Sequence, residues 1–118
     1  TSLYKRREYL SFAKRYEAYV IEDDFDSEFF VKGRPIETLY SMNPERVIYL
    51  NTFSKSLSPA MRLGYMILPE SLNKTYDAKL GKFSCSVPVM DQYVLAEFIS
   101  SGNFERHLNR RRKQLIKI

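Results

Sequence analysis

The stretch VIYLNTFSKSLSPAMRLGYMIL, residues 47–68, decides how this chain of 118 residues is expected to fold. It holds two apolar runs, residues 47–50 and 63–68, separated by a segment in which serine, threonine, lysine and arginine side chains gather. Short apolar runs without strict alternation are typical of strands that are buried on both faces of a sheet. We therefore predict two central strands joined by a polar loop.

A third apolar run, residues 18–21, lies nearer the N-terminus and is followed at once by the acidic segment 22–28. Helical spacing of apolar side chains, or a proline suited to a first helical turn, predicts helices elsewhere. The predicted helices are the first segment with its apolar face Tyr9, Phe12, Ala13 and Tyr16, a single turn at 36–40, residues 69–80, residues 88–101 and the segment from Asn103 onward. This order of helices and strands indicates the α/β class, and we expect a mostly parallel sheet flanked by helices.

Composition excludes several other classes of protein. Hydrophobic residues make up 44% of the chain and charged residues 28%, which is ordinary for a globular domain and argues against a disordered chain. A single cysteine, Cys85, excludes a disulfide framework, and a single histidine, His107, argues against a metal site built from histidines. No apolar stretch approaches the ~18 residues that span a membrane, and no secretory signal opens the chain, so we expect a cytoplasmic protein without a membrane partner.

Charged side chains follow two of the predicted strands. Asp23 and its acidic neighbours come directly after the run 18–21. Lys55 and Arg62 lie in the loop that follows the run 47–50. Ligands of α/β sheets bind outside the carboxyl ends of the strands, and arginine offers a planar fork to phosphate oxygens, so the loop is a candidate anion or phosphate site. The motif G-x-x-x-x-G-K-[ST] is absent, which excludes a P-loop.

A lysine beside a bound anion has a second use. Its amine, once desolvated and deprotonated, can form a Schiff base with an aldehyde. An aspartate nearby would keep a ring nitrogen protonated, and the arginine would hold a phosphate. These requirements together are those of pyridoxal phosphate (PLP). From the residues alone a second interpretation stays open, in which Lys55 and Arg62 are solvated surface charges and the acidic segment is a loop or a helix N-terminus.

Two motifs resemble those of a known family. Residues 54–64, SKSLSPAMRLG, are similar to the lysine loop S-K-x-x-x-P-G-x-R-x-G of fold-type I PLP enzymes, the class I aminotransferases. Residues 20–29, VIEDDFDSEF, resemble the segment I-E-D-D-Y-D-S-E-F of MocR-type transcriptional regulators, also called the GabR-like group. The likeness continues in order and spacing at 33–35, 47–55 and 102–108, and it runs from about residue 1 to about residue 113.

The resemblance implies a fragment of the large domain of a fold-type I PLP-dependent transferase. Regulators of the MocR type belong to the GntR family. They carry an N-terminal winged helix-turn-helix that binds DNA, a linker, and an aminotransferase-like domain that binds PLP and forms a homodimer. Residues 1–118 would then be part of the aminotransferase-like domain, and DNA would be bound only through an N-terminal domain that these residues do not include. The basic run 110–113 is therefore interpreted as a solvated helix face.

The resemblance also assigns roles residue by residue. Lys55 matches the lysine that holds the cofactor as a Schiff base, and Asp23 matches the aspartate that is paired with the pyridine nitrogen. Arg62 matches the arginine that binds the phosphate, while Thr52 and Ser54 match hydroxyl positions near the phosphate. Lys55 and Asp23 are therefore the predicted catalytic residues if the protein is an enzyme.

Two residues depart from the family pattern. Phe25 stands at the cofactor-binding position where a tyrosine usually hydrogen-bonds the phenolic oxygen of PLP, so a donor is missing there. Ala60 stands where glycine is usual, which is harmless unless the backbone at that position is left-handed.

Two functions are compatible with the resemblance. The first is the PLP-binding effector domain of a MocR-type regulator, which responds to PLP or to an amino acid or amine that exchanges with Lys55. The second is a PLP-dependent aminotransferase of the 2-aminoadipate kind, which transfers an amino group between an amino acid and a 2-oxo acid. Such enzymes tend to have proline and then tyrosine after the acidic pair. Here Phe25 follows Asp24 directly, which favours the regulator.

Overall fold

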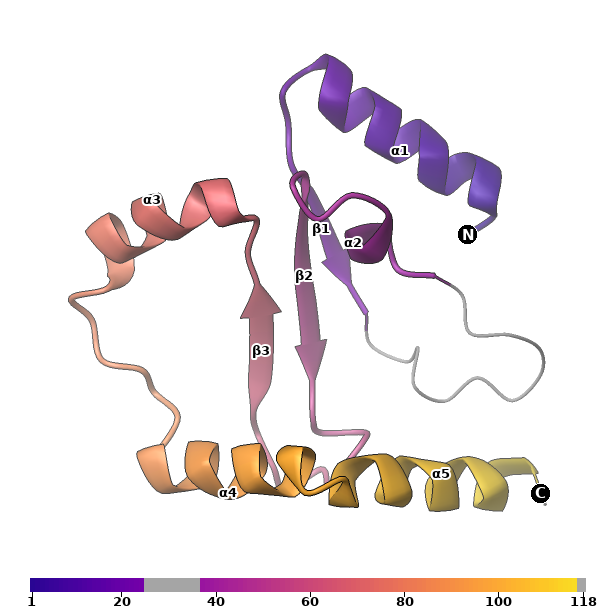
Figure 1. Cartoon of the computed structure of the whole chain (residues 1–118), viewed down its shortest axis with the longest axis vertical. Coiled ribbons are helices and arrows are strands. Elements are labelled where there is room, and N and C mark those ends of the chain that lie inside the picture. The colour runs from indigo at the N-terminus through magenta and orange to yellow at the C-terminus, as the bar shows by residue number, and fades with distance from the viewer. Residues whose placement is uncertain (25–36, 117–118) are drawn as a thin grey trace.

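The computed structural model describes residues 1–24 and 37–116, and it shows helices arranged around a small sheet (Figure 1). In chain order the elements are α1 (Leu3–Arg15), β1 (Val20–Asp23), α2 (Leu39–Met42), β2 (Val47–Thr52), β3 (Gly64–Ile67), α3 (Glu70–Leu80), α4 (Val89–Ser100) and α5 (Asn103–Ile116). The α/β class and the three predicted strands are confirmed, and the helical turn predicted at 36–40 is found slightly later, as α2. Among these described helices, none has both the length and the apolar character of a membrane-spanning segment.

The sheet has the strand order β1-β2-β3 and contains both kinds of pairing. β1 runs parallel to β2, with Asp23 opposite Leu50. β3 runs antiparallel to β2, with Gly64 opposite Thr52. Only the residues 53–63 join β2 to β3, and this connection is too short for the crossover that parallel neighbours need. The expected parallel arrangement therefore holds for β1 and β2, whereas β3 reverses direction and makes the described sheet mixed.

One face of this sheet is buried. Side chains alternate between the two faces along a strand, and the alternate residues Val47, Tyr49 and Asn51 of β2 are only 0%, 9% and 6% exposed. Leu10 of α1 and Leu39 of α2 pack against Val47, so these two helices cover the buried face.

The opposite face of the sheet is open within the described residues. Ile21 of β1 has 64% of its surface exposed, and Met66 of β3 has 46% exposed. The prediction of strands buried on both faces is therefore wrong for the residues that the structure describes. The open face continues along β1 to Asp23, which lies two residues beyond Ile21 and so shares its side of the sheet.

A second apolar cluster lies beyond the carboxyl end of β2. Phe53 and Leu63, at the two ends of the connecting loop, pack with Leu95 of α4, and Phe104 of α5 joins them. α4 and α5 lie nearly end to end across this end of the sheet (Figure 1). Between the two helices Gly102 has a φ of 77°, the left-handed conformation that ends α4 where the sequence predicts. The loop after β2 is thus packed against two helices.

The helix α1 buries a different side from the predicted one. Leu10 and Ala13 are buried, whereas Phe12 and Tyr16 are 61% and 60% exposed, with ring centroids 4.6 Å apart. The predicted face, which combined Ala13 with Tyr9, Phe12 and Tyr16, is therefore wrong at its aromatic positions. Leu10 takes their place because it is the side chain that reaches the cluster on the buried face of the sheet.

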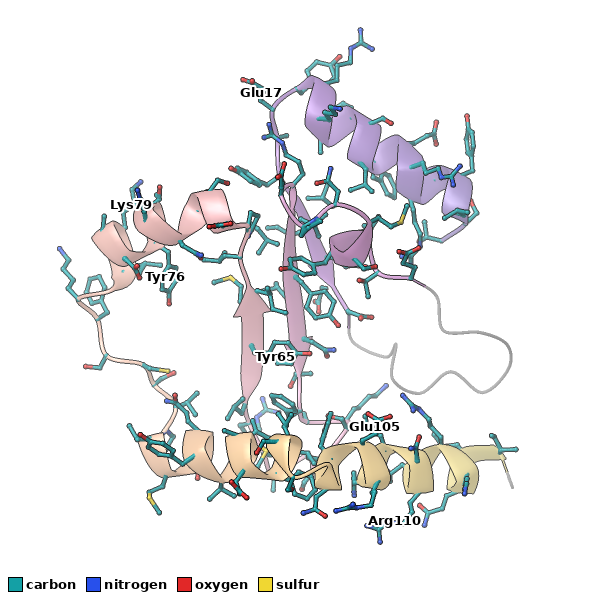
Figure 2. All side chains as sticks on the ribbon, viewed as in Figure 1. Glu17, Tyr65, Tyr76, Lys79, Glu105 and Arg110 are labelled. Carbon is teal, nitrogen blue, oxygen red and sulfur yellow. The ribbon has the colours of Figure 1, made fainter. Side chains whose placement is uncertain are left out.

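The basic run of α5 lies in solvent. Arg110, Arg111 and Lys113 are exposed, and Arg110 points away from the sheet (Figure 2). Arg112 donates a hydrogen bond to Asn109 Oδ1 on the same helix, at 3.1 Å. These placements fit the interpretation of the run as a solvated helix face.

Candidate functional site

Asp23 and Thr52 end the parallel strands β1 and β2 on the same face of the sheet. Asp23 is paired with Leu50, and Thr52 lies two residues beyond Leu50 in β2, so alternation places Asp23 and Thr52 on one side. Neighbouring strands ~4.8 Å apart, with a rise of ~3.3 Å per residue, put the two Cα atoms roughly 8 Å from each other. Asp23 is exposed, and the face it shares with Thr52 is the open face of the sheet.

Lys55 sits in a single helical turn directly after β2. The backbone N–H of Leu57 donates to the carbonyl oxygen of Phe53 at 2.9 Å and closes this turn. Phe53 and Ser56 are buried, with 8% and 1% exposed, whereas Lys55 is exposed. The turn therefore fixes the backbone around Lys55 and leaves its side chain at the surface.

Two hydroxyls tie this lysine turn to the segment that carries Arg62. Ser54 Oγ donates to the carbonyl oxygen of Met61 at 3.1 Å. Thr52 Oγ1 lies 3.2 Å from the carbonyl oxygen of Leu63 and 3.0 Å from Ser54 Oγ. Because Met61 and Leu63 flank Arg62 in the chain, these bonds hold the lysine and the arginine on one loop whose ends are joined.

The two hydroxyls thus have a bonding role that the sequence does not indicate. A hydroxyl has a single proton to donate, and that of Ser54 goes to a backbone carbonyl. A phosphate oxygen accepts hydrogen bonds. Thr52 and Ser54 would therefore donate to a phosphate only if they gave up the hydrogen bonds that close the loop. The guanidinium of Arg62 is exposed and makes no ion pair within residues 1–24 and 37–116, which leaves it ready to meet an anion.

The substitution of alanine for the usual glycine at residue 60 causes no backbone strain. Among the described residues other than glycine, only Glu17 has a positive φ, of 51°. The N–H of Ala60 donates to Ser58 Oγ at 3.2 Å. The second departure from the family pattern, Phe25, lies outside the described residues, as does the part of the likeness at 33–35.

A buried polar network lies directly behind these residues, on the other face of the sheet. The hydroxyl of Tyr49 donates to Asp24 Oδ2 at 2.6 Å and accepts from Asn51 Nδ2 at 3.0 Å. Burial, and then the hydrogen bond to Asp24, raise the pKa of Tyr49 well above its ordinary value, so the hydroxyl keeps its proton and remains a donor. The sequence predicts a strand only over 47–50 and places Asn51 in the following loop, whereas β2 extends to Thr52 and so puts Tyr49 and Asn51 on one face.

Glu22 also belongs to the buried face. Its two carboxylate oxygens accept hydrogen bonds from the N–H groups of Leu39 and Tyr40, each at 2.9 Å, at the start of α2. The Arg6 guanidinium lies 3.9 Å from the same carboxylate. Of the acidic residues 22–24, the first and the last are therefore engaged on the buried face, and Asp23 is the one on the open face.

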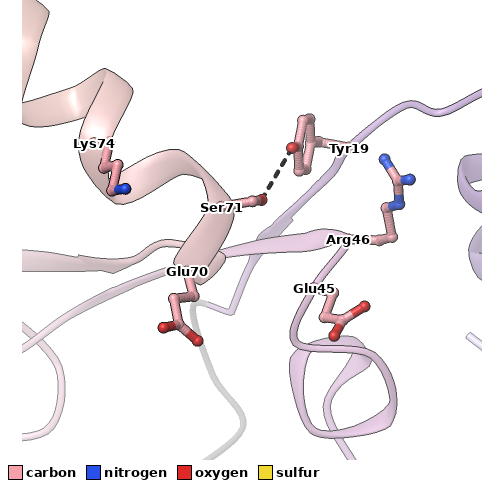
Figure 3. Close-up of a pocket in the computed structure, with 6 residues that line it drawn as sticks. All are labelled: Tyr19, Glu45, Arg46, Glu70, Ser71 and Lys74. Carbon is pink, nitrogen blue, oxygen red and sulfur yellow. Dashed lines mark hydrogen bonds between the residues drawn. The ribbon is translucent and has the colours of Figure 1, made fainter.

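A polar pocket of about 630 Å³ lies at the opposite end of the sheet (Figure 3). Its walls are Tyr19, Glu45, Arg46, Glu70, Ser71 and Lys74. Tyr19 and Arg46 immediately precede β1 and β2, so the pocket adjoins the amino ends of the parallel strands. Ligands of α/β sheets bind at the carboxyl ends, and the pocket is therefore separate from the candidate site.

A second cavity, of about 520 Å³, adjoins Arg62, between the loop and the start of α4, where Pro88 and Asp91 line it.

Cys85 and His107 take no part in the candidate site, since Cys85 is an exposed free thiol and His107 packs against Phe98. In the part of the chain that the structure describes, no three His, Cys, Asp or Glu side chains come together as metal ligands.

Known proteins match almost the whole chain. The sequence profile of the family described as "Aminotransferase class I and II" matches residues 2–117. The chain is 41% identical over 109 residues to the uncharacterized HTH-type transcriptional regulator YhdI of Bacillus subtilis, a match that covers 92% of this chain and 23% of that protein. It is 35% identical over 105 residues to the probable rhizopine catabolism regulatory protein MocR of Rhizobium meliloti, covering 88% of this chain and 21% of that protein.

A solved structure is similar along almost the whole chain. It is LysN, the alpha-aminoadipate aminotransferase of Thermus thermophilus, complexed with N-(5'-phosphopyridoxyl)-L-leucine, and it matches with a TM-score of 0.76 at 31% identity. The match covers 96% of this chain and 30% of that one. The chain thus spans 21% to 30% of the length of these three proteins.

Proposed function

The chain belongs to the family of class I and II aminotransferases, and from that premise we propose that it forms the PLP-binding part of a MocR-type transcriptional regulator. In this proposal residues 1–118 belong to the aminotransferase-like domain of a longer, cytoplasmic and homodimeric protein that binds DNA through an N-terminal helix-turn-helix. The regulatory role is supported by the names of two relatives, one an HTH-type transcriptional regulator and the other a probable regulatory protein.

The observation that carries the proposal is the position of Asp23 and Thr52 on one face, at the carboxyl ends of β1 and β2, beside the loop with Lys55 and Arg62. A carboxylate, a primary amine and a guanidinium fit the ring nitrogen, the aldehyde and the phosphate of PLP in turn. When bound, PLP supplies an aldehyde that condenses with amines and a ring that withdraws electrons.

Each of these residues has its own task in the proposal. Lys55 presents its amine to the cofactor aldehyde, and Asp23, as an anion, keeps a proton on the ring nitrogen. Arg62 neutralises the phosphate with a planar pair of N–H donors. Thr52 and Ser54 keep the loop closed and so fix how far Lys55 lies from Arg62.

An aminotransferase is the second candidate function. It is favoured by the likeness to a solved alpha-aminoadipate aminotransferase. In that case Lys55 would also act as the base that moves a proton within the substrate. For the aminotransferase the small molecule is an amino acid, and for the regulator it is PLP itself or an amino acid or amine that exchanges with Lys55 at the cofactor aldehyde.

The test is a map of the lysine that PLP modifies in the full-length protein. The protein is incubated with PLP, reduced with borohydride, digested and analysed by mass spectrometry, and we expect the phosphopyridoxyl group on Lys55. Lys55→Arg keeps the charge but loses the adduct, since a guanidinium is too weak a nucleophile. Lys74→Arg, a control at the far end of the sheet, should keep it. An adduct on another lysine, or none on the unaltered protein, overturns the assignment.

Two further measurements on the same protein separate the regulator from the enzyme. A gel-shift titration against DNA from its own promoter, with and without PLP, measures whether the cofactor changes DNA affinity. An assay of amino-group transfer to 2-oxo acids measures turnover. A cofactor-dependent change in DNA affinity without turnover supports the regulator, and turnover without DNA binding supports the aminotransferase.

A further inference from the structure

We propose that Tyr49 and Asp24 are positioning residues for Asp23, because their hydrogen bond on the buried face directs the Asp23 carboxylate to the open face. The inference rests on the proposed function, since Asp23 is the carboxylate that would meet the ring nitrogen of the cofactor. It extends that function by giving a task to two residues on the opposite side of the sheet.

The direction of Asp23 is decided at the end of β1. Asp23 is the last residue of the strand, and the N–H of Asp24 still donates to the carbonyl oxygen of Leu50 at 2.9 Å, so the ladder continues one residue further. Consecutive side chains of an extended segment point to opposite faces. Holding Asp24 on the buried face therefore sends Asp23 to the open face.

The ring of Tyr49 is packed tightly enough to hold Asp24 in place. Its side chain is 9% exposed, and its ring centroid lies 6.1 Å from that of Tyr40 and 6.1 Å from that of Tyr65. Tyr49 is paired across the strands with Glu22, whose carboxylate is held at the start of α2. The ring has little room to move, so the 2.6 Å bond from its hydroxyl fixes Asp24 as well.

The same network reaches the other strand end of the site. Asn51 donates from Nδ2 to the Tyr49 hydroxyl at 3.0 Å and accepts at Oδ1 from the N–H of Thr52 at 2.7 Å. One chain of hydrogen bonds thus runs behind the sheet from Asp24 through Tyr49 and Asn51 to Thr52. This chain joins the ends of β1 and β2, which carry Asp23 and the Thr52 hydroxyl on their open side. It therefore sets the distance between the residue proposed to meet the ring nitrogen of the cofactor and the loop proposed to meet its phosphate.

The test measures the proton on the ring nitrogen of the cofactor. The full-length protein is loaded with PLP labelled with ¹⁵N in the ring, and NMR follows the nitrogen as a function of pH. Tyr49→Phe removes the hydroxyl and keeps the packed ring. We expect the nitrogen to lose its proton at lower pH, with a roughly tenfold loss of proton affinity, because the anion that stabilises the protonated ring is displaced. The control Tyr40→Phe, whose ring packs against Tyr49, should titrate as the unaltered protein.

Substitutions of Asp24 provide a second route to the same answer. Asp24→Asn keeps an oxygen that accepts the hydrogen bond of Tyr49 and should titrate as the unaltered protein, whereas Asp24→Ala should behave like Tyr49→Phe. Normal titration in both Tyr49→Phe and Asp24→Ala overturns the positioning role, whatever happens to folding stability. A shift in Asp24→Asn without a shift in Tyr49→Phe overturns it too, because both Asp24 variants remove the charge, and that charge rather than the hydrogen bond would then act on the ring. If the unaltered protein takes up no PLP, the proposed function has failed instead.

Discussion

Ser54 Oγ donates a hydrogen bond to the backbone carbonyl of Met61 at 3.1 Å, and so joins the residue before Lys55 to the residue before Arg62. Lys55 and Arg62 carry the two cationic side chains that are proposed to bind one small molecule. The uncharged side chain of Ser54 therefore holds the backbone beside these two residues together. The relation makes the shape of the loop, and not only its charge, a property that mutation can test.

We expect Ser54→Ala to lower the free energy of unfolding by about 1 kcal/mol, because the carbonyl of Met61 loses its donor. Denaturation by urea measures the change. Ser100→Ala is a matched control, since it removes an exposed hydroxyl that bonds Glu97 on α4 at 3.2 Å, and its effect should stay within about 0.5 kcal/mol. An equal loss of unfolding free energy in the two variants would show that the Ser54 hydrogen bond stabilises the fold no more than a surface contact does.

The junction of α4 and α5 depends on the left-handed backbone of Gly102, with its φ of 77°. An added Cβ would meet nothing within 4 Å, so the cost of a side chain is conformational. We expect Gly102→Ala to destabilise the fold by about 1–2 kcal/mol, and Gly102→Asn by less, because asparagine tolerates this conformation. Thermal denaturation should rank the melting temperatures glycine, asparagine, alanine. An alanine variant as stable as the unaltered protein would contradict the assigned backbone.

Stability at alkaline pH should depend on Tyr49. Burial, followed by its hydrogen bond to Asp24, raises the pKa of Tyr49 in the folded state above the ordinary value of 10.0. The unfolded chain then releases this proton first, so the contribution to stability is complete below about pH 10 and is lost as the pH rises further. Unfolding free energies measured from pH 8 to 11 should fall more steeply in the unaltered protein than in Tyr49→Phe. Parallel curves would mean that Tyr49 ionises alike in both states.

Phe25 is expected to leave the phenolic oxygen of the cofactor without a donor, as the family resemblance implies. Phe25→Tyr in the full-length protein should therefore lower the pH at which the absorption band of the Lys55-bound cofactor titrates. A hydrogen bond to a charged group is worth ~1.5–3 kcal/mol, which corresponds to roughly one to two pH units. Spectrophotometric titration of both proteins is the measurement. Curves that superimpose, or a rise with tyrosine, would require a new alignment of the acidic segment, including the role of Asp23.

The strand ends of the candidate site could be predicted because each depends on a short piece of sequence. An apolar run followed by Asp23, and another followed by Thr52, are local patterns, and parallel pairing then brings them to one edge. The antiparallel direction of β3 could also have been predicted from the sequence, since residues 53–63 are too few for a crossover.

The buried network was beyond prediction for a physical reason. The bond between Tyr49 and Asp24 joins residues 25 positions apart, and it exists only because of the register between β1 and β2. A change of register by one residue would turn Tyr49 to the other face. The same limit explains the error in α1, where helical spacing could not tell that Leu10, and not the rings of Phe12 and Tyr16, meets the sheet.

The antiparallel direction of β3 has a consequence for the order in which the site assembles during folding. β2 and β3 are joined by residues 53–63, whereas pairing β1 with β2 must close the longer segment 24–46. Each doubling of a closed loop costs about 0.6 kcal/mol more in chain entropy, and non-local pairings slow folding. Lys55 and Arg62 should therefore come together early, on a hairpin-like unit, before β1 adds the aspartate. Pulsed hydrogen exchange would record this order as protection of β2–β3 amides ahead of those in β1.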